Sequence, residues 1–522
     1  MAHITDKQLD AKDFINRVVD SYNHGTAEEG LEANAEVARS IIPAATGAFR
    51  DFSYIAPEIP EFIAENCVGC MDCVTECPDT AILAKVIPDE TIEKSMATHN
   101  AAEKQQISKH WAKTQKYYEL PQKKGQTGGK FGIFIDPTKC KGCAECVTVC
   151  GPQKNALKMI PKNKEVLDEA RLSFKFFKQE TPPTPKEFIN EKILADLMLK
   201  DESLLYVGGA GSCMGCGEGT ALRMLMAATG FVYPKEDIGI VAATGCNTVY
   251  SSTYPYNPFA TSWTNSLFEN APADAMGVRM RWDQQGWQKK RLWVIGGDGA
   301  MNDIGFQSLS RLLVSGADIK VFVMDTQVYS NTGGQASTGT YMAQNAKMAN
   351  HGTSVFGKTE RRKELALIAA MHPDVFVAQT TAAHINHFYK AVMTANEFPG
   401  PAVINVYTTC QPEHGVADNM ASSQAKLAVD TRAFPLFIYD PRKGETMAER
   451  FSLQGNPGLV DDWYVNPKTG KAVDFVEFAR SEGRFMKQFD KDGNPSQIIL
   501  DAQSDRLKNW RTLQDLAGVK RK

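Results

Sequence analysis

The sequence has no apolar run of about 18 residues, the length that a helix needs to cross a bilayer. Its first residues, MAHITDKQLD, lack the basic stretch followed by an apolar one that marks a secretory signal. A net charge of −3 offers no basic surplus for binding nucleic acid. We therefore expect a soluble, cytoplasmic protein that binds neither membranes nor nucleic acid.

A disordered composition is also lacking. Hydrophobic residues make up 43% of the chain and charged residues 23%, which are ordinary values for globular proteins. At roughly 150 residues per domain, the chain has room for two to four domains.

The twelve cysteines are the most informative residues, and disulfides are not expected for them in a chain without a secretory signal. Eight of them form two runs of the spacing C-x2-C-x2-C-x3-C: Cys67, Cys70, Cys73 and Cys77, then Cys140, Cys143, Cys146 and Cys150. This is the bacterial ferredoxin pattern for two [4Fe–4S] clusters. Two zinc sites are the alternative, although zinc needs only four ligands at looser spacing.

In that ferredoxin pattern the last cysteine of each run binds the other cluster. The spacing therefore predicts one cluster on Cys67, Cys70, Cys73 and Cys150, and a second on Cys140, Cys143, Cys146 and Cys77. The lysine-rich insertion between the runs is expected to be a solvated loop with a helical piece, and a docking surface for an acidic electron carrier is the alternative.

Short apolar segments ending in polar or glycine-rich turns alternate with helical segments further along the chain. They are IGIVAATG, RLWVIGGDG, IKVFVMDT and PAVINVYTT, which end at Gly245, Gly299, Thr326 and Thr409. Strands that alternate with helices predict an α/β fold with a doubly wound parallel sheet, preceded here by a small α+β ferredoxin-like domain. Ligands of such sheets bind beyond the carboxyl ends of the strands.

A candidate diphosphate site lies at two of these strand ends. Gly297-Asp298-Gly299 allows close approach of the backbone to a phosphate and offers a carboxylate to Mg²⁺. The next strand ends at Thr326, and the turn beyond it runs to Asn331. A GDG turn alone is often an ordinary turn, but together with an asparagine-bearing turn at this spacing it is typical of thiamine-diphosphate sites.

The remaining cysteines, Cys213, Cys216, Cys246 and Cys410, all fall at the same predicted edge of the sheet. A zinc site, a redox pair or a third [4Fe–4S] cluster fits their pattern. A cluster beside a thiamine site makes chemical sense, since it accepts electrons one at a time.

The chain resembles, over roughly residues 60–430, the C-terminal half of pyruvate:ferredoxin (2-oxoacid:ferredoxin) oxidoreductases. The resemblance rests on the double cysteine pattern and on SCMGCGEG, ATGC, SWTNSLFENAPADAMG, GGDGAMNDIGF and DTQVYSNTGGQAS. It implies five segments: a mainly helical extension (1–60), a 2[4Fe–4S] ferredoxin-like domain with a basic insertion (61–165), a linker (166–204), a thiamine-diphosphate-binding domain with a proximal cluster (205–435) and a C-terminal extension (436–522).

The resemblance also implies site residues. Cys213, Cys216, Cys246 and Cys410 would hold the proximal cluster, and Asp298, Thr326 and the carbonyl of Val328 would hold Mg²⁺. The residues expected to touch the cofactor are Glu218, Cys246, Gly297, Asp298, Gly299, Ala300, Thr326, Val328 and Asn331. Asn331, facing the substrate, and Glu218 would be catalytic, although Glu218 also suits a plain helix N-terminus.

The activity implied is CoA-dependent oxidative decarboxylation of pyruvate to acetyl-CoA and CO₂ in anaerobic metabolism, with electrons passed through three clusters to ferredoxin or flavodoxin. Alternatives are another 2-oxo acid (2-oxoglutarate or an aryl pyruvate) and an electron-transfer subunit with a vestigial thiamine site. The large N-terminal half of single-chain members is not present here. The resemblance therefore implies the beta-type subunit of a split enzyme, with a second subunit in a hetero-oligomer, a dimer of heterodimers.

Overall fold

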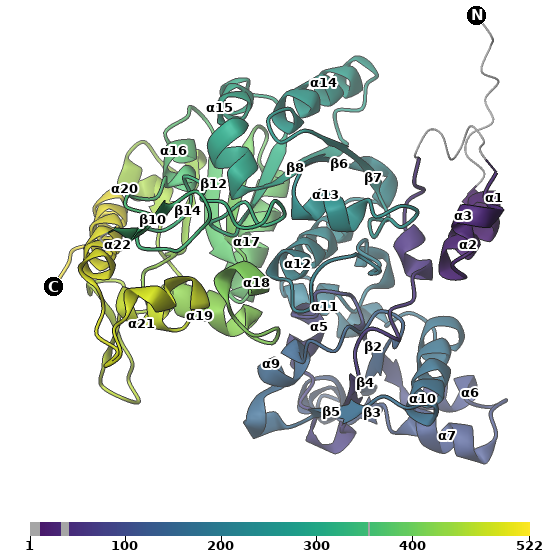
Figure 1. The fold of residues 1–522 in the computed structure, drawn as a ribbon. Helices are drawn as coiled ribbons and strands as arrows, with labels where there is room; N and C mark the ends of the chain where they lie inside the picture. The colour runs from purple at the N-terminus through teal and green to yellow at the C-terminus, as the bar shows by residue number, and fades with distance from the viewer. Residues whose placement is uncertain (1–10, 33–40, 353–354) are drawn as a thin grey trace, which may run out of the picture. The chain divides into compact units, whose positions relative to one another are not determined.

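The computed structural model describes residues 11–32, 41–352 and 355–522 (Figure 1). The chain forms two compact units, which are described separately. The first comprises Met1–Asn190, Ala195–Ser212 and Val249–Trp263; the second comprises Glu191–Leu194, Cys213–Thr248 and Thr264–Lys522. Part of the predicted N-terminal extension, 1–10 and 33–40, lies outside the described residues. Among the residues that are described, no helix has the length and apolar character needed to cross a bilayer.

The second unit is built on an eight-stranded sheet of order β15-β14-β12-β13-β9-β8-β6-β7. Its central strands are parallel and almost wholly buried. They are β12 (Phe376–Thr381), β13 (Ala402–Tyr407), β9 (Lys320–Asp325), β8 (Arg291–Gly297) and β6 (Ile238–Ala243). Burial of both faces is typical of a parallel sheet covered by helices on each side. The predicted doubly wound α/β sheet is confirmed.

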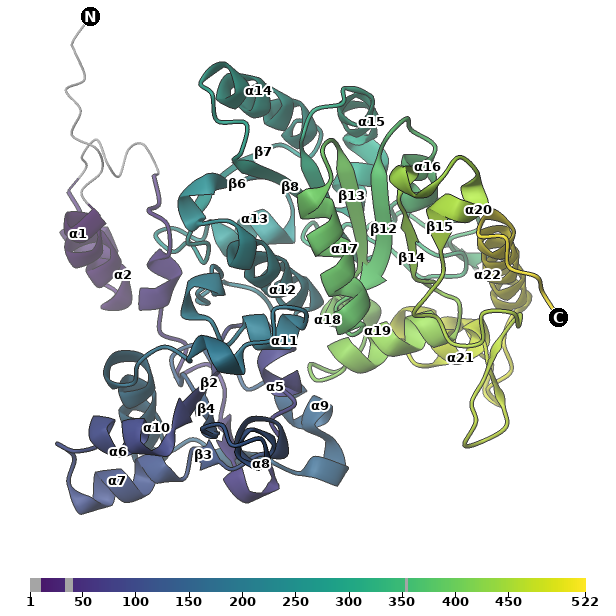
Figure 2. The ribbon, with the colours of Figure 1, turned by 180° about the vertical axis from the view of Figure 1, so that it is seen from behind.

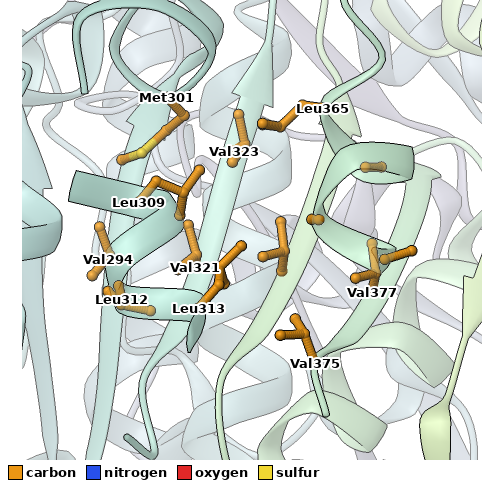
Figure 3. Close-up of a cluster of buried hydrophobic side chains, with 14 of the residues drawn as sticks. Val294, Met301, Leu309, Leu312, Leu313, Val321, Val323, Leu365, Val375 and Val377 are labelled. Carbon is orange, nitrogen blue, oxygen red and sulfur yellow. The ribbon is translucent and has the colours of Figure 1, made fainter. Parts of the chain in front are cut away.

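Helices cover both faces of this sheet, as the opposite views of Figures 1 and 2 show. On one face the valines of β8 and β9 pack with leucines of α15 (Phe306–Val314), as Figure 3 shows. On the other face Phe322 meets Phe388 of α17 (Ile385–Glu397), with ring centroids 6.0 Å apart. Successive residues of a strand point to opposite faces, so one strand serves both layers.

The other helices of this part are α12 (Gly217–Val232), α13 (Cys246–Ser251), α14 (Ala271–Gln284), α16 (Leu365–Ala370), α18 (Gln411–His414) and α19 (Ala421–Asp430). Short strands are β7 (Ser262–Ser266), β10 (Asn350–His351) and β11 (Phe356–Gly357).

The C-terminal segment after about residue 436 is an integral part of the second unit. It adds the antiparallel edge strands β14 (Phe437–Tyr439) and β15 (Phe451–Ser452) to the sheet. Its remaining elements are α20 (Met447–Arg450), β16 (Tyr464–Val465), β17 (Ala472–Val473), α21 (Phe475–Arg480) and α22 (Gln497–Leu516). Trp510 and Leu513 of α22 belong to the same buried cluster as the central strands.

The first unit holds the eight ferredoxin-type cysteines. Its strands form an antiparallel pair, β1 (Glu58–Phe62) with β5 (Leu157–Pro161), and a three-stranded sheet of order β2-β4-β3, namely Ile82–Pro88, Gly129–Ile135 and Trp111–Ala112. Its helices are α1 (Ala11–Asp13), α2 (Asp20–Asn23), α3 (Ala27–Gly30), α5 (Asp72–Thr75), α6 (Asp89–Ser95), α7 (Ala101–Ser108), α8 (Leu120–Lys123), α9 (Glu145–Lys154) and α10 (Lys164–Lys175), and α11 (Leu194–Leu197) begins at the boundary. This mixture of short helices and strands is consistent with the ferredoxin-like domain expected from the cysteine runs.

We expect Trp510→Ala to lower the free energy of unfolding by about 3–5 kcal/mol, the range for truncating a buried aromatic residue. Trp510 is fully buried, its Nε1–H donates to the carbonyl of Asp461 at 2.8 Å, and the guanidinium of Arg432 lies 4.0 Å from its ring centroid. Leu500→Ala, on the exposed side of the same helix, is the control and should change stability little. Urea unfolding of the two variants measures the difference, and equal effects would contradict the packing of α22 into the core.

Candidate functional site

The turns that follow β6, β8 and β9 meet at the carboxyl edge of the sheet and line a cavity there. Its lining residues are Glu218, Thr244, Gly245, Cys246, Asn247, Phe268, Gly297, Gly299, Ala300, Thr326, Val328, Tyr329, Ser330, Asn331 and Thr332. Every residue predicted to touch the cofactor lines this cavity except Asp298, which is fully buried directly behind Thr326. Their role in binding stays a prediction.

Three oxygen-bearing groups converge behind the cavity. The hydroxyl and the backbone N–H of Thr326 each lie 3.2 Å from Oδ1 of Asp298. The Thr326 hydroxyl also lies 3.2 Å from the carbonyl oxygen of Val328. The Ser330 hydroxyl donates to the Thr326 hydroxyl at 2.8 Å. A carboxylate, a hydroxyl and a carbonyl form an all-oxygen set, which suits Mg²⁺.

The electrostatics of Asp298 also suit a cation. Burial raises the pKa of Asp298, and the neighbouring carboxylates Asp325 and Asp303 raise it further, against hydrogen bonds from Ser337 and Thr326. A carboxylate in such surroundings is costly to ionise. A bound divalent cation would favour the ionised form of Asp298, because it would be the largest positive charge in the site.

Gly299 is required by the packing of Tyr329. A Cβ at Gly299 would lie 2.4 Å from Cε1 of the Tyr329 ring. The Tyr329 hydroxyl donates to the carbonyl of Gly299 at 3.1 Å and reaches the carboxylate of Asp303 at 3.0 Å. The second glycine of the GDG turn therefore lets the two turns lie against each other. The sequence predicted that a phosphate would approach the backbone closely here, and in the structure the Tyr329 ring makes a close approach to Gly299.

The last four cysteines lie together with Glu218 in the second unit. Burial raises the pKa of Cys246, and the charges around it raise it further: those of Glu218, Cys216, Cys410 and Cys213. Burial likewise raises the pKa of Cys410 to about 11, opposed by hydrogen bonds from the Glu413 backbone and the Ser330 side chain. The raised pKa values of Cys216, Cys246 and Cys410 keep these thiols neutral, and a cationic centre that binds them would stabilise them as thiolates.

Two close approaches of the backbone bring these cysteines together. A Cβ at Gly217, the first residue of α12, would lie 2.5 Å from the backbone nitrogen of Thr409. Gly215, at φ +69°, faces the carbonyl of Asp418, which a Cβ would overlap. The glycines of CMGCGEG thus let the start of α12 reach the end of β13, where Cys410 follows.

The two ferredoxin-type runs in the first unit fold alike. Gly69 and Gly142 both have left-handed backbones, at φ 71° and 73°, and so do Met71 and Ala144, at φ 70° and 62°. Each run then enters a helix at the equivalent residue, α5 at Asp72 and α9 at Glu145. Left-handed conformations are costly for residues with a Cβ. Their recurrence at the same places indicates that the two runs form the same type of loop and that the surrounding structure enforces it.

Thiols of the two runs lie close to one another. Burial raises the pKa of Cys73, and the charges of Cys67, Cys70 and Cys150 raise it further. Burial raises the pKa of Cys140 to about 12, with Cys77 adding to it, and the pKa of Cys146 is raised by burial and by the charges of Cys143, Cys77, Cys140 and Cys73. The fourth cysteine of each run therefore lies near thiols of the other run, and the assignment of the two cluster sets stays a prediction.

In the part of the chain that the structure describes, no three His, Cys, Asp or Glu side chains converge as ligands of one metal ion. An iron–sulfur cube does not need such convergence, since each thiolate binds a different iron. Lys154 fits an anionic cluster as well: its ammonium donates to Sγ of Cys70 at 3.2 Å and pairs with Asp72 at 2.7 Å.

Comparison with known proteins finds a matching family model and several similar enzymes. Residues 243–406 match the family described as thiamine pyrophosphate enzyme, C-terminal TPP binding domain. A probable pyruvate-flavodoxin oxidoreductase of Escherichia coli (strain K12) is 27% identical over 474 residues, covering 77% of this chain and 38% of that protein. The pyruvate:ferredoxin oxidoreductase of Moorella thermoacetica is 26% identical over 593 residues, covering 96% of this chain and 46% of that protein. The chain is related to the pyruvate oxidoreductases.

This relationship confirms the resemblance seen in the motifs. The chain spans less than half the length of these curated pyruvate oxidoreductases. A solved 2-oxoglutarate:ferredoxin oxidoreductase from Magnetococcus marinus is 21% identical with a TM-score of 0.34, over 38% of this chain and 64% of that one, a similarity too slight to carry a conclusion.

Sequence reasoning missed several lining residues, among them Asn247 and Phe268. Both lie inside or beside motifs that carry the resemblance, in ATGCNT and SLFEN. Their positions in or beside these motifs could have indicated that they line the same cavity.

Gly299→Ala should weaken the binding of thiamine diphosphate in the presence of Mg²⁺ by about tenfold or more, roughly 1.4 kcal/mol, because the added methyl group displaces Tyr329 from the cavity wall. Gly277→Ala is the control: it lies inside α14 with no heavy atom within 4 Å of the added carbon, and should stabilise the helix by about 0.5–1 kcal/mol without affecting the cofactor. Isothermal titration of both variants decides the matter, and wild-type affinity in Gly299→Ala would contradict the role given to this glycine.

Proposed function

We propose that this chain is the thiamine-diphosphate and iron–sulfur part of an enzyme that decarboxylates pyruvate oxidatively, transfers the acetyl group to coenzyme A and passes electrons to ferredoxin or flavodoxin. The observation that carries the proposal is the joint placement of two features at one sheet edge. Cys246, one of the four clustered cysteines, lines the same cavity as Thr326 and Val328 of the oxygen set, and Glu218 lies in the wall beside it.

The cavity and its oxygen set fit thiamine diphosphate with Mg²⁺. Asp298, the Thr326 hydroxyl and the Val328 carbonyl would hold the cation, and the GDG turn would lie along the diphosphate. When bound, thiamine diphosphate supplies the carbanion chemistry that removes CO₂ from a 2-oxo acid. The protein's task is to orient the cofactor and to exclude water from the cavity.

The polar groups at the mouth and wall of the cavity have distinct tasks. Asn331 is exposed at the lining and can donate a hydrogen bond from its amide to a substrate oxygen. Glu218 is 4% exposed in the first turn of α12, where the helix dipole favours its charge. We assign it a cofactor contact from the wall of the cavity, beside Cys246.

The twelve cysteines would hold three [4Fe–4S] clusters in the sets given above. When bound, the clusters accept electrons singly and pass them on. Lys154 would counter the negative charge of the first ferredoxin-type cluster through Cys70, which is exposed and thus accessible to an external carrier.

Further parts of the enzyme are proposed to come from a second polypeptide. The related pyruvate oxidoreductases are more than twice as long as the part that this chain matches. We propose a hetero-oligomer, a dimer of heterodimers in the cytoplasm, in which a partner subunit completes the substrate and coenzyme A sites.

The metal content of the anaerobically purified chain tests the cluster assignment. We expect about twelve irons and twelve sulfides per chain, four for each of three clusters. About eight irons with one zinc would instead make the set on Cys410 structural and overturn the electron path proposed here.

Cys213→Ser should lower the iron content by about four per chain and abolish pyruvate-dependent reduction of ferredoxin, because it removes a ligand of the proximal set. Cys70→Ser is the matched control. It removes a ligand of the first ferredoxin-type set, so the proximal cluster should still be reduced in a single turnover, seen by rapid-freeze EPR. Unimpaired ferredoxin reduction by Cys213→Ser would refute the assignment of Cys213 to the proximal cluster.

The same assay identifies the substrate when 2-oxoglutarate or an aryl pyruvate replaces pyruvate.

A further inference from the structure

The turn that carries two of the proposed Mg²⁺ ligands is held from behind by buried side chains. It runs from Asp325, the last residue of β9, to Val328, and all four of its residues are buried. The side chain of Asp325 accepts hydrogen bonds from Arg362 at 2.7 Å and from Asn405 at 3.1 Å. These contacts fix the start of the turn to the sheet.

Gln327, in the middle of this turn, has a left-handed backbone at φ +59°. That conformation is uncommon for a residue with a Cβ and persists only when the surroundings enforce it. It lies between Thr326 and Val328, so it sets how the hydroxyl of one and the carbonyl of the other face Asp298. The carbonyl of Gln327 accepts from the Thr340 hydroxyl at 2.5 Å and from Gln344 at 3.3 Å.

The side chain of Gln327 is held by an ion pair from the C-terminal segment. Nη1 of Arg484 donates to Oε1 of Gln327 at 3.0 Å, and Nε of Arg484 donates to Glu482 at 2.5 Å. Glu482 in turn accepts from the hydroxyl of Tyr407, the last residue of β13, at 2.9 Å. Both charged side chains are buried, and a buried pair of this kind holds its geometry because either charge alone would be costly.

His414 supplies a second support to the same turn. Its Nε2–H donates to the carbonyl of Thr326 at 2.8 Å, and its backbone N–H donates to the carbonyl of Cys410 at 2.8 Å. The ring is fully buried, with Nδ1 3.9 Å from Glu482. One short helix, α18, therefore joins a cysteine of the proximal set to the turn at Thr326.

We infer that Glu482 and Arg484 are positioning residues for the metal–diphosphate turn, acting through Gln327. The inference rests on the proposed function, and it gives a role to a C-terminal segment in which the sequence shows no motif. Side chains behind metal ligands orient them, and their loss typically costs about 10–100-fold in metal affinity.

The variant Glu482→Gln with Arg484→Met tests this. Replacing both residues leaves no unpaired buried charge, and the glutamine keeps an acceptor for Tyr407. In titrations of the full chain with Mg²⁺ and thiamine diphosphate, we expect the dissociation constant to rise by about 10–100-fold. Iron content and the EPR spectra of the clusters should stay as in the wild type.

A control variant separates positioning from general stability. Arg291→Met with Asp318→Asn removes another ion pair of the second unit, 2.7 Å long, at the amino end of β8. It joins a buried arginine to a partly exposed aspartate that also pairs with Lys320. We expect this control variant to lower the thermal midpoint at least as much as the test variant while leaving the cofactor affinity unchanged.

A third variant tests the route through Gln327. Glycine adopts the left-handed backbone freely, so Gln327→Gly needs no support from Arg484. In that background, the double substitution at 482 and 484 should change the dissociation constant by less than about twofold. Substitutions that act through the same residue are not additive, and here that residue, Gln327, has already been replaced.

The outcomes are distinct. Wild-type affinity in the variant changed at 482 and 484, or equal loss of affinity in the control, would overturn the inference and leave the proposed function standing. Full additivity with Gln327→Gly would also overturn it. Absence of cofactor binding by the wild-type chain would overturn the proposed function and this inference together.

Discussion

Much of the second unit is arranged around a buried carboxylate. Asp298 ends up without exposure at the carboxyl end of β8, where burial and nearby acids oppose its ionisation. Donors from Thr326 and Ser337 offset part of that cost, and a divalent cation bound there would offset the rest. The parallel sheet makes this possible, because it delivers the ends of β8 and β9 to one edge in register.

The first unit uses a different constraint. Cysteine ligands of a cube must come from loops that curl tightly around it, and a curl of that kind needs residues in the left-handed region. Both runs have such residues at equivalent places, although one member of each pair is not glycine. Met71 and Ala144 therefore adopt the same costly backbone conformation at equivalent places, which supports the proposal that the two loops hold the same kind of group.

The sequence predicted the parts of the fold and site that depend on local chemistry. The GDG turn and strands β6, β8, β9 and β13 follow from short-range patterns of apolar residues and glycines. Strand β12, FVAQTT, was not predicted because its polar residues interrupt the apolar run that marks a buried strand. The antiparallel edge strands and the place of Val249–Trp263 in the first unit were missed because they depend on contacts distant in sequence.

The contact between Arg484 and Gln327 illustrates the same limit at the level of function. These residues are separated by more than 150 positions. Gln327 lies in the turn that the sequence marks as part of the diphosphate site, whereas Arg484 belongs to no motif that signals metal or phosphate binding. Their meaning appears only when β9 and the C-terminal segment are folded on each other, because the ion pair and the left-handed turn then meet in one buried place. The C-terminal segment contributes buried side chains to the core and, by the inference above, also positions the turn at the site.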